Sequence, residues 1–93
     1  MLYMITPKNE GVSVGLTSTS VLAASEARES VVLVNDSDEV IYLALGGDAV
    51  LNKGIRLNAA GGSYEINGSN PFTGAITAIC ASGSKNLCVM EKY

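Results

Sequence analysis

Residues 30–45, SVVLVNDSDEVIYLAL, predict two β-strands joined by a turn. The first run, Ser30–Val34, is rich in β-branched side chains, which pack well on a pleated sheet. The turn formers Asn35-Asp36-Ser37-Asp38 follow, and Val40–Leu45 is a second apolar run that ends at Gly46-Gly47. We expect these two strands to pair as a hairpin.

The rest of the chain repeats this pattern of short apolar runs separated by turn residues. Such spacing is typical of an antiparallel sandwich or barrel. Arg56, between two apolar neighbours, should face water. The further strands expected are 55–57, 63–66 after the turn Gly61-Gly62, 74–81 and 86–90, the last two joined as a second hairpin by residues 82–85. The fold class predicted is therefore all-β, a small antiparallel β-sandwich of about seven strands.

The first 30 residues give a weaker pattern. Residues 21–29 contain helix formers, but nine residues make a marginal helix, so we expect a strand at 20–24 and a turn at 25–28. Residues 12–14 alternate and predict an earlier strand. This gives an N-terminal arm over residues 1–11 and a sandwich domain over residues 12–93. The arm, apolar at its start, either adds a strand to a neighbouring subunit or is a disordered terminus.

Composition argues against enzyme chemistry. The 93 residues include no His and no Trp, and only 16% are charged while 47% are apolar. Without His, the many Ser and Thr hydroxyls lack their usual partner base, so we predict a non-enzymatic protein with no catalytic residues and no cofactor. The apolar excess is more than a monomer of this size hides easily, which favours a homo-oligomer or a docked subunit.

The distribution of charge and hydropathy excludes two classes of partner. The six basic residues are scattered and the net charge is −3, so nucleic acid is not expected. No run approaches the roughly 18 apolar residues that span a bilayer, and the start of the chain lacks the basic flank of a signal peptide. We therefore expect no membrane partner and synthesis in the cytoplasm.

Two groups of residues could in principle form a site. Asp36, Asp38 and Glu39 could bind calcium, but their spacing is not that of an EF-hand and such residues are expected in turns, so no metal is predicted. Cys80 and Cys88 should lie opposite each other across the second predicted hairpin, where a disulfide is conceivable. Reduced thiols that pack as small apolar side chains are the favoured interpretation.

Five aromatic side chains could line a sugar-binding surface, but they form no cluster in the sequence. Tyr42 and Tyr64 lie in predicted strands and are expected to be core or sheet-face residues. The others are Tyr3, Phe72 and Tyr93. A glycan partner stays open on this basis.

The segments 32–37 (VLVNDS) and 41–47 (IYLALGG) resemble small β-sandwich proteins encoded among bacteriophage and prophage virion genes. The resemblance continues through 54–57 (GIRL), 61–66 (GGSYEI), 74–79 (GAITAI) and 81–84 (ASGS), and covers about residues 12–92. It implies a part of the virion, such as a capsid decoration, neck, tail or fibre component, and it implies no catalytic residues.

The sequence therefore predicts a phage virion structural subunit that assembles with itself and with other virion proteins through strand edges and apolar patches. Its expected location is the virion, after synthesis in the bacterial cytoplasm. The alternative is a receptor- or carbohydrate-binding module at a virion tip.

Overall fold

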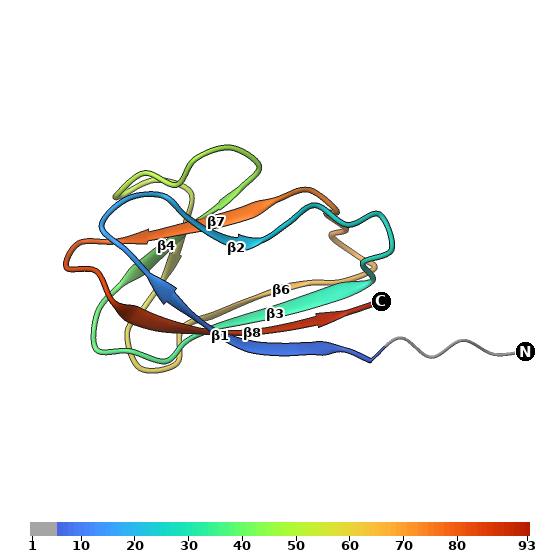
Figure 1. The fold of residues 1–93 in the computed structure, drawn as a ribbon, viewed down its shortest axis with the longest axis horizontal. Helices are drawn as coiled ribbons and strands as arrows, with labels where there is room; N and C mark the ends of the chain where they lie inside the picture. Colours follow the sequence, from blue (N-terminus) through green and yellow to red (C-terminus); the bar gives the residue numbers. More distant parts are fainter. Residues whose placement is uncertain (1–5) are drawn as a thin grey trace, which may run out of the picture.

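The computed structural model describes residues 6–93, which form eight β-strands in two antiparallel sheets (Figure 1). The all-β sandwich is as predicted, with eight strands where about seven were expected. Sheet A has the order β1-β8-β3-β6, and sheet B has the order β2-β7-β4-β5. The strands are β1 (Lys8–Val14), β2 (Thr19–Leu22), β3 (Ser30–Asn35), β4 (Ile41–Leu45), β5 (Ile55–Leu57), β6 (Ser63–Ile66), β7 (Ile76–Cys80) and β8 (Lys85–Lys92).

The strands pair from the two ends of the chain inward. β1 pairs with β8, β2 with β7, β3 with β6, and β4 with β5. Two further pairings, β3 with β8 and β4 with β7, join these four pairs into two sheets that lie one over the other (Figure 1). Eight antiparallel strands in two packed sheets with this nested pairing form a jelly roll.

Both hairpins predicted from the sequence are wrong. β3 belongs to sheet A and β4 to sheet B, and β7 and β8 are likewise in different sheets. One cause is Asn35, which is fully buried at the end of β3. Its side-chain amide donates hydrogen bonds to the carbonyls of Glu39 (2.7 Å) and Leu57 (3.0 Å), so the chain leaves sheet A at this point. The only consecutive strands that pair among residues 6–93 are β4 and β5.

The N-terminal part of the domain begins earlier than expected. Residues 8–11, assigned to the arm by sequence, form the first half of β1 and pair with residues 88–91 of β8. The sandwich therefore starts at Lys8, not at residue 12, and residues 1–5 of the arm lie outside the described residues. The predicted turn at 25–28 is present, closed by a hydrogen bond from the Arg28 N–H to the Ser25 carbonyl (3.2 Å).

The core lies between the two sheets and follows the alternation along each strand. In β3, Val31, Leu33 and Asn35 point inward and are buried, while the residues between them are half-buried on the outside. Burying one such aliphatic side chain stabilises the fold by about 1.5–3 kcal/mol. Arg56 is exposed, as expected. No helix in the described part of the chain could span a membrane.

Candidate functional site

The outer face of sheet A carries a block of apolar side chains. In β3, Val32 and Val34 point outward, and in β8 Cys88 and Met90 do the same. The register places Val32 opposite Met90 and Val34 opposite Cys88, so the four side chains form a compact block at the centre of the sheet. All four are only half-buried in the folded chain. We call these four residues the sheet A stripe.

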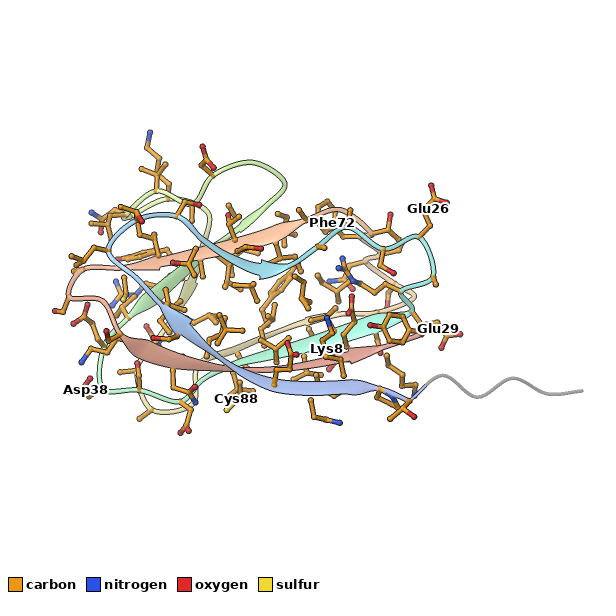
Figure 2. All side chains as sticks on the ribbon, in the orientation of Figure 1. Lys8, Glu26, Glu29, Asp38, Phe72 and Cys88 are labelled. Atoms are coloured by element: carbon orange, nitrogen blue, oxygen red, sulfur yellow. The ribbon has the colours of Figure 1, made fainter. Side chains whose placement is uncertain are left out.

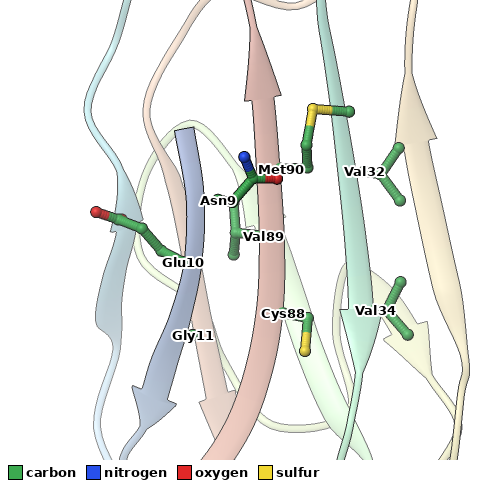
Figure 3. A pocket seen from close by; sticks show the side chains of 8 residues that line it. All are labelled: Asn9, Glu10, Gly11, Val32, Val34, Cys88, Val89 and Met90. Carbon is green, nitrogen blue, oxygen red and sulfur yellow. The ribbon is translucent and has the colours of Figure 1, made fainter. Parts of the chain in front are cut away.

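A shallow groove of about 410 Å³ lies over this stripe and extends toward β1 (Figure 3). Gly11 of β1 lies opposite Cys88, and its lack of a side chain leaves the β1 side of the groove open. A Cβ at Gly11 would come within 2.8 Å of the Asn86 side-chain oxygen. A side chain at residue 11 would therefore have to displace the Asn86 amide beside the groove.

Beside the groove, Asn86 and Asp36 make only long contacts with each other and with Cys88. The Asn86 amide lies 3.5 Å from an Asp36 carboxylate oxygen and 3.6 Å from the Cys88 sulfur. These distances are at the outer limit of hydrogen bonding. Figure 2 shows Cys88 on the outside of sheet A, away from the core.

The two cysteines do not face each other as expected from the sequence. Cys80 is fully buried in β7 of sheet B, where its thiol donates to the Val14 carbonyl at 3.3 Å. Cys88 lies in β8 on the outer face of sheet A. Both cysteines are free thiols. The wrong expectation follows directly from the wrong hairpin.

The outer face of sheet B, by contrast, is covered by the chain itself. The β4–β5 loop, residues 46–54, arches over β4 and β7 at the top of Figure 1. It is held by hydrogen bonds from the Thr77 hydroxyl to the Gly47 carbonyl (2.9 Å) and from the Tyr42 hydroxyl to the Asn52 side chain (2.9 Å). The Ala49 N–H also donates to the Ser18 hydroxyl (2.9 Å).

This cover buries apolar residues that would otherwise face water. Ile79 points outward from β7, opposite Tyr42, yet it is only 8% exposed. Ala49 in the loop is 5% exposed, and neither residue belongs to the core between the sheets. Sheet B therefore has a second, smaller apolar layer on its outside.

A buried ion pair closes the end of the sandwich near the C-terminus. The Arg28 guanidinium donates from Nε to Glu91 Oε2 at 2.7 Å, and the exposed fractions of the two side chains are 0% and 3%. The same guanidinium donates to the carbonyls of Ala23 (2.8 Å), Gly74 (2.8 Å) and Phe72 (3.1 Å). Every nitrogen of the buried cation thus has an acceptor, which is the condition for tolerating such a charge in the interior.

The charged partners of Glu91 set its protonation. Burial alone would raise the pKa of Glu91, but hydrogen bonds from Tyr93 and Arg28 and the charges of Arg28 and Lys8 outweigh burial and hold that pKa below its ordinary value. The Tyr93 hydroxyl donates to Glu91 Oε1 at 2.7 Å, and this bond raises the pKa of Tyr93. Through Arg28, these interactions hold the β2–β3 loop, the β6–β7 loop and β8 together.

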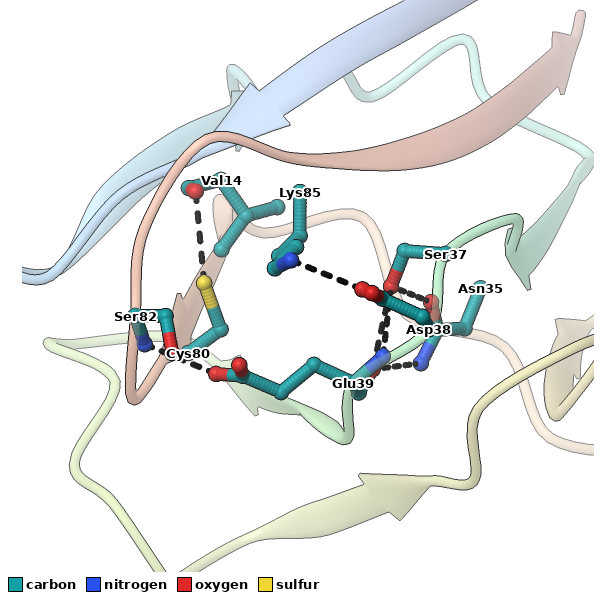
Figure 4. A network of polar contacts seen from close by, with 8 residues as sticks. All are labelled: Val14, Asn35, Ser37, Asp38, Glu39, Cys80, Ser82 and Lys85. Carbon is teal, nitrogen blue, oxygen red and sulfur yellow. Dashed lines mark hydrogen bonds and ion pairs between the residues drawn. The ribbon is translucent and has the colours of Figure 1, made fainter.

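The acidic residues singled out in the sequence do not converge. Asp38 accepts a hydrogen bond from Lys85 at 2.7 Å, and this bond lowers the pKa of Asp38 and raises that of Lys85 (Figure 4). Glu39 turns instead toward the β7–β8 connection, where it accepts from the Ser82 N–H at 2.7 Å, and bonding to Ser82 lowers its pKa. Asp36 lies beside Asn86. Among residues 6–93 no three such side chains gather in a way that could hold a metal ion.

The aromatic residues lie in separate places. Tyr64 and Phe72 pack against the core, while Tyr42 lies on the outer face of sheet B. Tyr93 is bound to Glu91, and Tyr3 lies outside the described residues. The described rings therefore offer no shared stacking surface for a sugar.

The groove offers apolar surface, while the polar side-chain groups buried in the described part of the chain are already paired. Every buried side-chain nitrogen and oxygen among the described residues has a hydrogen-bond partner within the chain. The groove over the sheet A stripe is lined mainly by apolar side chains. What this site can do chemically is bury another apolar surface.

Comparisons of the chain with family models, with curated proteins and with solved structures found no match.

Proposed function

We propose that this chain is a non-enzymatic structural subunit of a phage virion, assembled through protein–protein contacts. The observation that carries the proposal is the sheet A stripe, an apolar block at the centre of a sheet that no other described segment covers. Apolar surface of this kind is stabilised by burial against a partner. The proposed partners are further copies of the chain and other virion proteins.

The architecture supports this proposal by analogy. Jelly rolls form viral capsid domains, and they also occur in lectins and cupins, so the fold alone does not choose among these uses. The resemblance of segments such as 32–37 and 41–47 to virion β-sandwich proteins adds support from the sequence side. The dispersed aromatic rings give the sugar-binding alternative no comparable surface.

The first experiment measures the native mass of the purified protein by light scattering after size exclusion, over a range of concentrations. A closed oligomer with a defined number of subunits is the expected result, because subunits of a symmetric assembly bury identical surfaces. A mass that stays monomeric at every concentration would contradict self-assembly.

The second experiment tests the location. Particles induced from the bacterium that encodes the chain are banded on a density gradient, and their proteins are identified by mass spectrometry. The chain should band with the particles and stay with them after salt washing. Its absence from intact particles, or binding to cell-surface glycans in an array, would overturn the structural role.

A further inference from the structure

We infer that residues 1–5 of one copy bind in the groove over the sheet A stripe of a second copy. This inference rests on the proposed function as an assembling subunit, and it names the contact through which the copies would join. The occupant is the segment Met1-Leu2-Tyr3-Met4-Ile5, and the receptor is the block formed by β3 and β8.

The composition of the segment suits the groove. Residues 1–5 are five consecutive apolar side chains with no Asp, Glu, Lys or Arg. In an extended segment alternate residues share a face, so one face would present Leu2 and Met4, and the other face would carry the Tyr3 hydroxyl as its only polar side-chain group. Its burial would remove no charged side chain from water, and it would cover apolar surface on both partners.

The length of the segment also suits the groove. Five extended residues span about 16 Å. The stripe runs from Val32 to Val34 along β3, a distance of about 7 Å for two strand residues. Residues 1–5 can therefore cover the whole stripe and still leave a connection to β1.

The point where the segment joins the domain favours a second copy as the receptor. Thr6 precedes Pro7, and a residue before proline is biased toward an extended conformation. β1 begins at Lys8, which lies opposite Glu91 near the end of β8, so an extended Thr6-Pro7 continues β1 beyond the end of sheet A. To reach the stripe of its own sheet, the chain would have to reverse direction within these two residues.

Cysteine cross-linking tests the contact, because Cys88 in the groove is half-exposed while Cys80 is fully buried. Single variants of the full chain, Leu2→Cys, Tyr3→Cys, Met4→Cys and Ile5→Cys, are incubated with oxidised glutathione as the oxidant. At least one should give a covalent dimer on a non-reducing gel that Cys88→Ser abolishes. A disulfide to Cys88 within one chain would overturn docking between copies, and failure of all four variants to link to Cys88 would overturn docking in the groove.

Complementation provides a second, independent measurement. Val34→Asp places a charge in the groove, and Leu2→Ser with Met4→Ser removes apolar groups from the segment. Each variant alone should self-associate about tenfold more weakly or worse than the unchanged chain, and an equal mixture should form a heterodimer, because one partner keeps its groove and the other its segment. Ser13→Asp is the matched control, on the same face of sheet A but outside the groove.

The outcomes separate this inference from the proposed function. If the chain assembles and enters particles but the segment variants assemble equally well, the docking inference fails and the structural role stands. If the mixture of the two variants forms no heterodimer although each folds, the docking inference also fails. If the unchanged chain neither self-associates nor enters particles, both fail.

Discussion

The outer faces of the two sheets both carry apolar side chains, but among the described residues only the outer face of sheet B is covered by another segment of the chain. On sheet B, the loop 46–54 folds over the strands and leaves Ile79 only 8% exposed. On sheet A, no described segment lies over the stripe of Val32, Val34, Cys88 and Met90, which stays half-exposed. An antiparallel sheet tolerates one solvated face when that face is polar. The apolar layer of sheet B is therefore covered within the chain, by a loop that itself exposes Val50 (48%) and Leu51 (37%), whereas the sheet A stripe has no cover among the described residues.

The comparison also separates two kinds of contact that hold the sheets. The loop over sheet B is held by neutral hydrogen bonds, which the Thr77 and Tyr42 hydroxyls donate and the Ser18 hydroxyl accepts. Sheet A ends in a buried charge, Glu91, paired with Arg28. The two regions should respond differently to pH and to substitution.

The largest effect is expected from breaking the charged contact of sheet A. Glu91→Gln leaves the Arg28 guanidinium buried without its counter-charge, and we expect a loss of about 3–5 kcal/mol in the free energy of unfolding, measured by chemical denaturation. Glu29→Gln, an exposed change of the same charge, is the control and should cost little. Equal costs for the two variants would show that the pair contributes no more than a surface charge.

The same residue gives sheet A its acid sensitivity. The pKa of Glu91 is lower in the folded chain than its ordinary value of 4.5, so on acidification the unfolded state takes up the proton first. This stability is present above about pH 4.5 and is lost as pH falls through the folded pKa. Amide exchange should show β8 losing protection in acid before the loop 46–54, and Glu91→Gln should flatten this part of the pH profile.

Removing the cover of sheet B should have the next largest effect. Gly54 has a φ of +80°, and a Cβ there would collide with the Leu43 carbonyl oxygen. Gly54→Ala should therefore cost about 3 kcal/mol or more in thermal or chemical unfolding, because the loop must be displaced from the sheet. Gly68→Ala, where a Cβ meets open space, is the control. A stable Gly54→Ala variant would mean that the loop tolerates another path.

A pair of truncations compares the two outer faces directly. Ile79→Ala removes a side chain buried under the loop, and we expect a cost of about 2–3 kcal/mol in the free energy of unfolding. Val34→Ala removes a side chain that is half-exposed in the single chain and should cost about 1 kcal/mol or less for the monomer. If unfolding is measured where the chain is assembled, the Val34→Ala cost should rise with protein concentration. A concentration-independent cost in assembled protein would argue against burial of the stripe between copies.

The smallest effect concerns one hydrogen bond of the cover. Ser18→Ala leaves the Ala49 N–H without its acceptor, and a lost bond at this partly buried position should cost about 1 kcal/mol. Exposed Ser20 gives the control, Ser20→Ala, in the neighbouring strand. Denaturant midpoints of the two variants measure the difference, and identical midpoints would mean that water replaces the Ser18 hydroxyl without loss.

Strand positions could be predicted from this sequence because short apolar runs, and the alternation of residue types along them, indicate which side chains are buried. The runs 30–35, 55–57 and 63–66 are strands within a residue of their predicted limits, and Arg56 faces water as expected. Glycine pairs and Asn-Asp clusters marked the connections, because these residues adopt turn conformations at low cost. The fold class follows from the number and spacing of such runs.

Strand partners could not be predicted in the same way. Period-two alternation shows which side chains point inward but not which strand lies alongside, so neighbouring runs were wrongly paired as hairpins. The side chain of Asn35 turns the chain toward sheet B by bonding to Leu57, which is distant in sequence. A pattern read along the chain contains no such long-range contact.

The sequence contains one indication of the buried Arg28–Glu91 ion pair that the sequence analysis missed. Glu91 continues the inward alternation of Leu87 and Val89 in β8, a pattern that indicates a buried carboxylate in need of a cation. Which of the six basic residues supplies that cation depends on the loop geometry, which places Arg28 against it. The groove could not be predicted from the sequence, because it depends on the strand register that places Gly11 opposite Cys88.

The nested pairing of the strands has a consequence for how the chain acquires its structure. β4 and β5 close the shortest loop of any paired strands. We expect folding to begin there, because this pairing brings β3 close to β6, which in turn brings β2 close to β7 and then β1 close to β8. Each step then closes a short effective loop although the ends are far apart in sequence, which lowers the entropic cost of a topology rich in distant contacts. During synthesis β8, which lies between β1 and β3, leaves the ribosome after the other seven described strands. Sheet A, with its groove, is therefore completed only after all the other strands have been synthesised, so a nascent chain that lacks β8 has no finished groove on which to assemble too early.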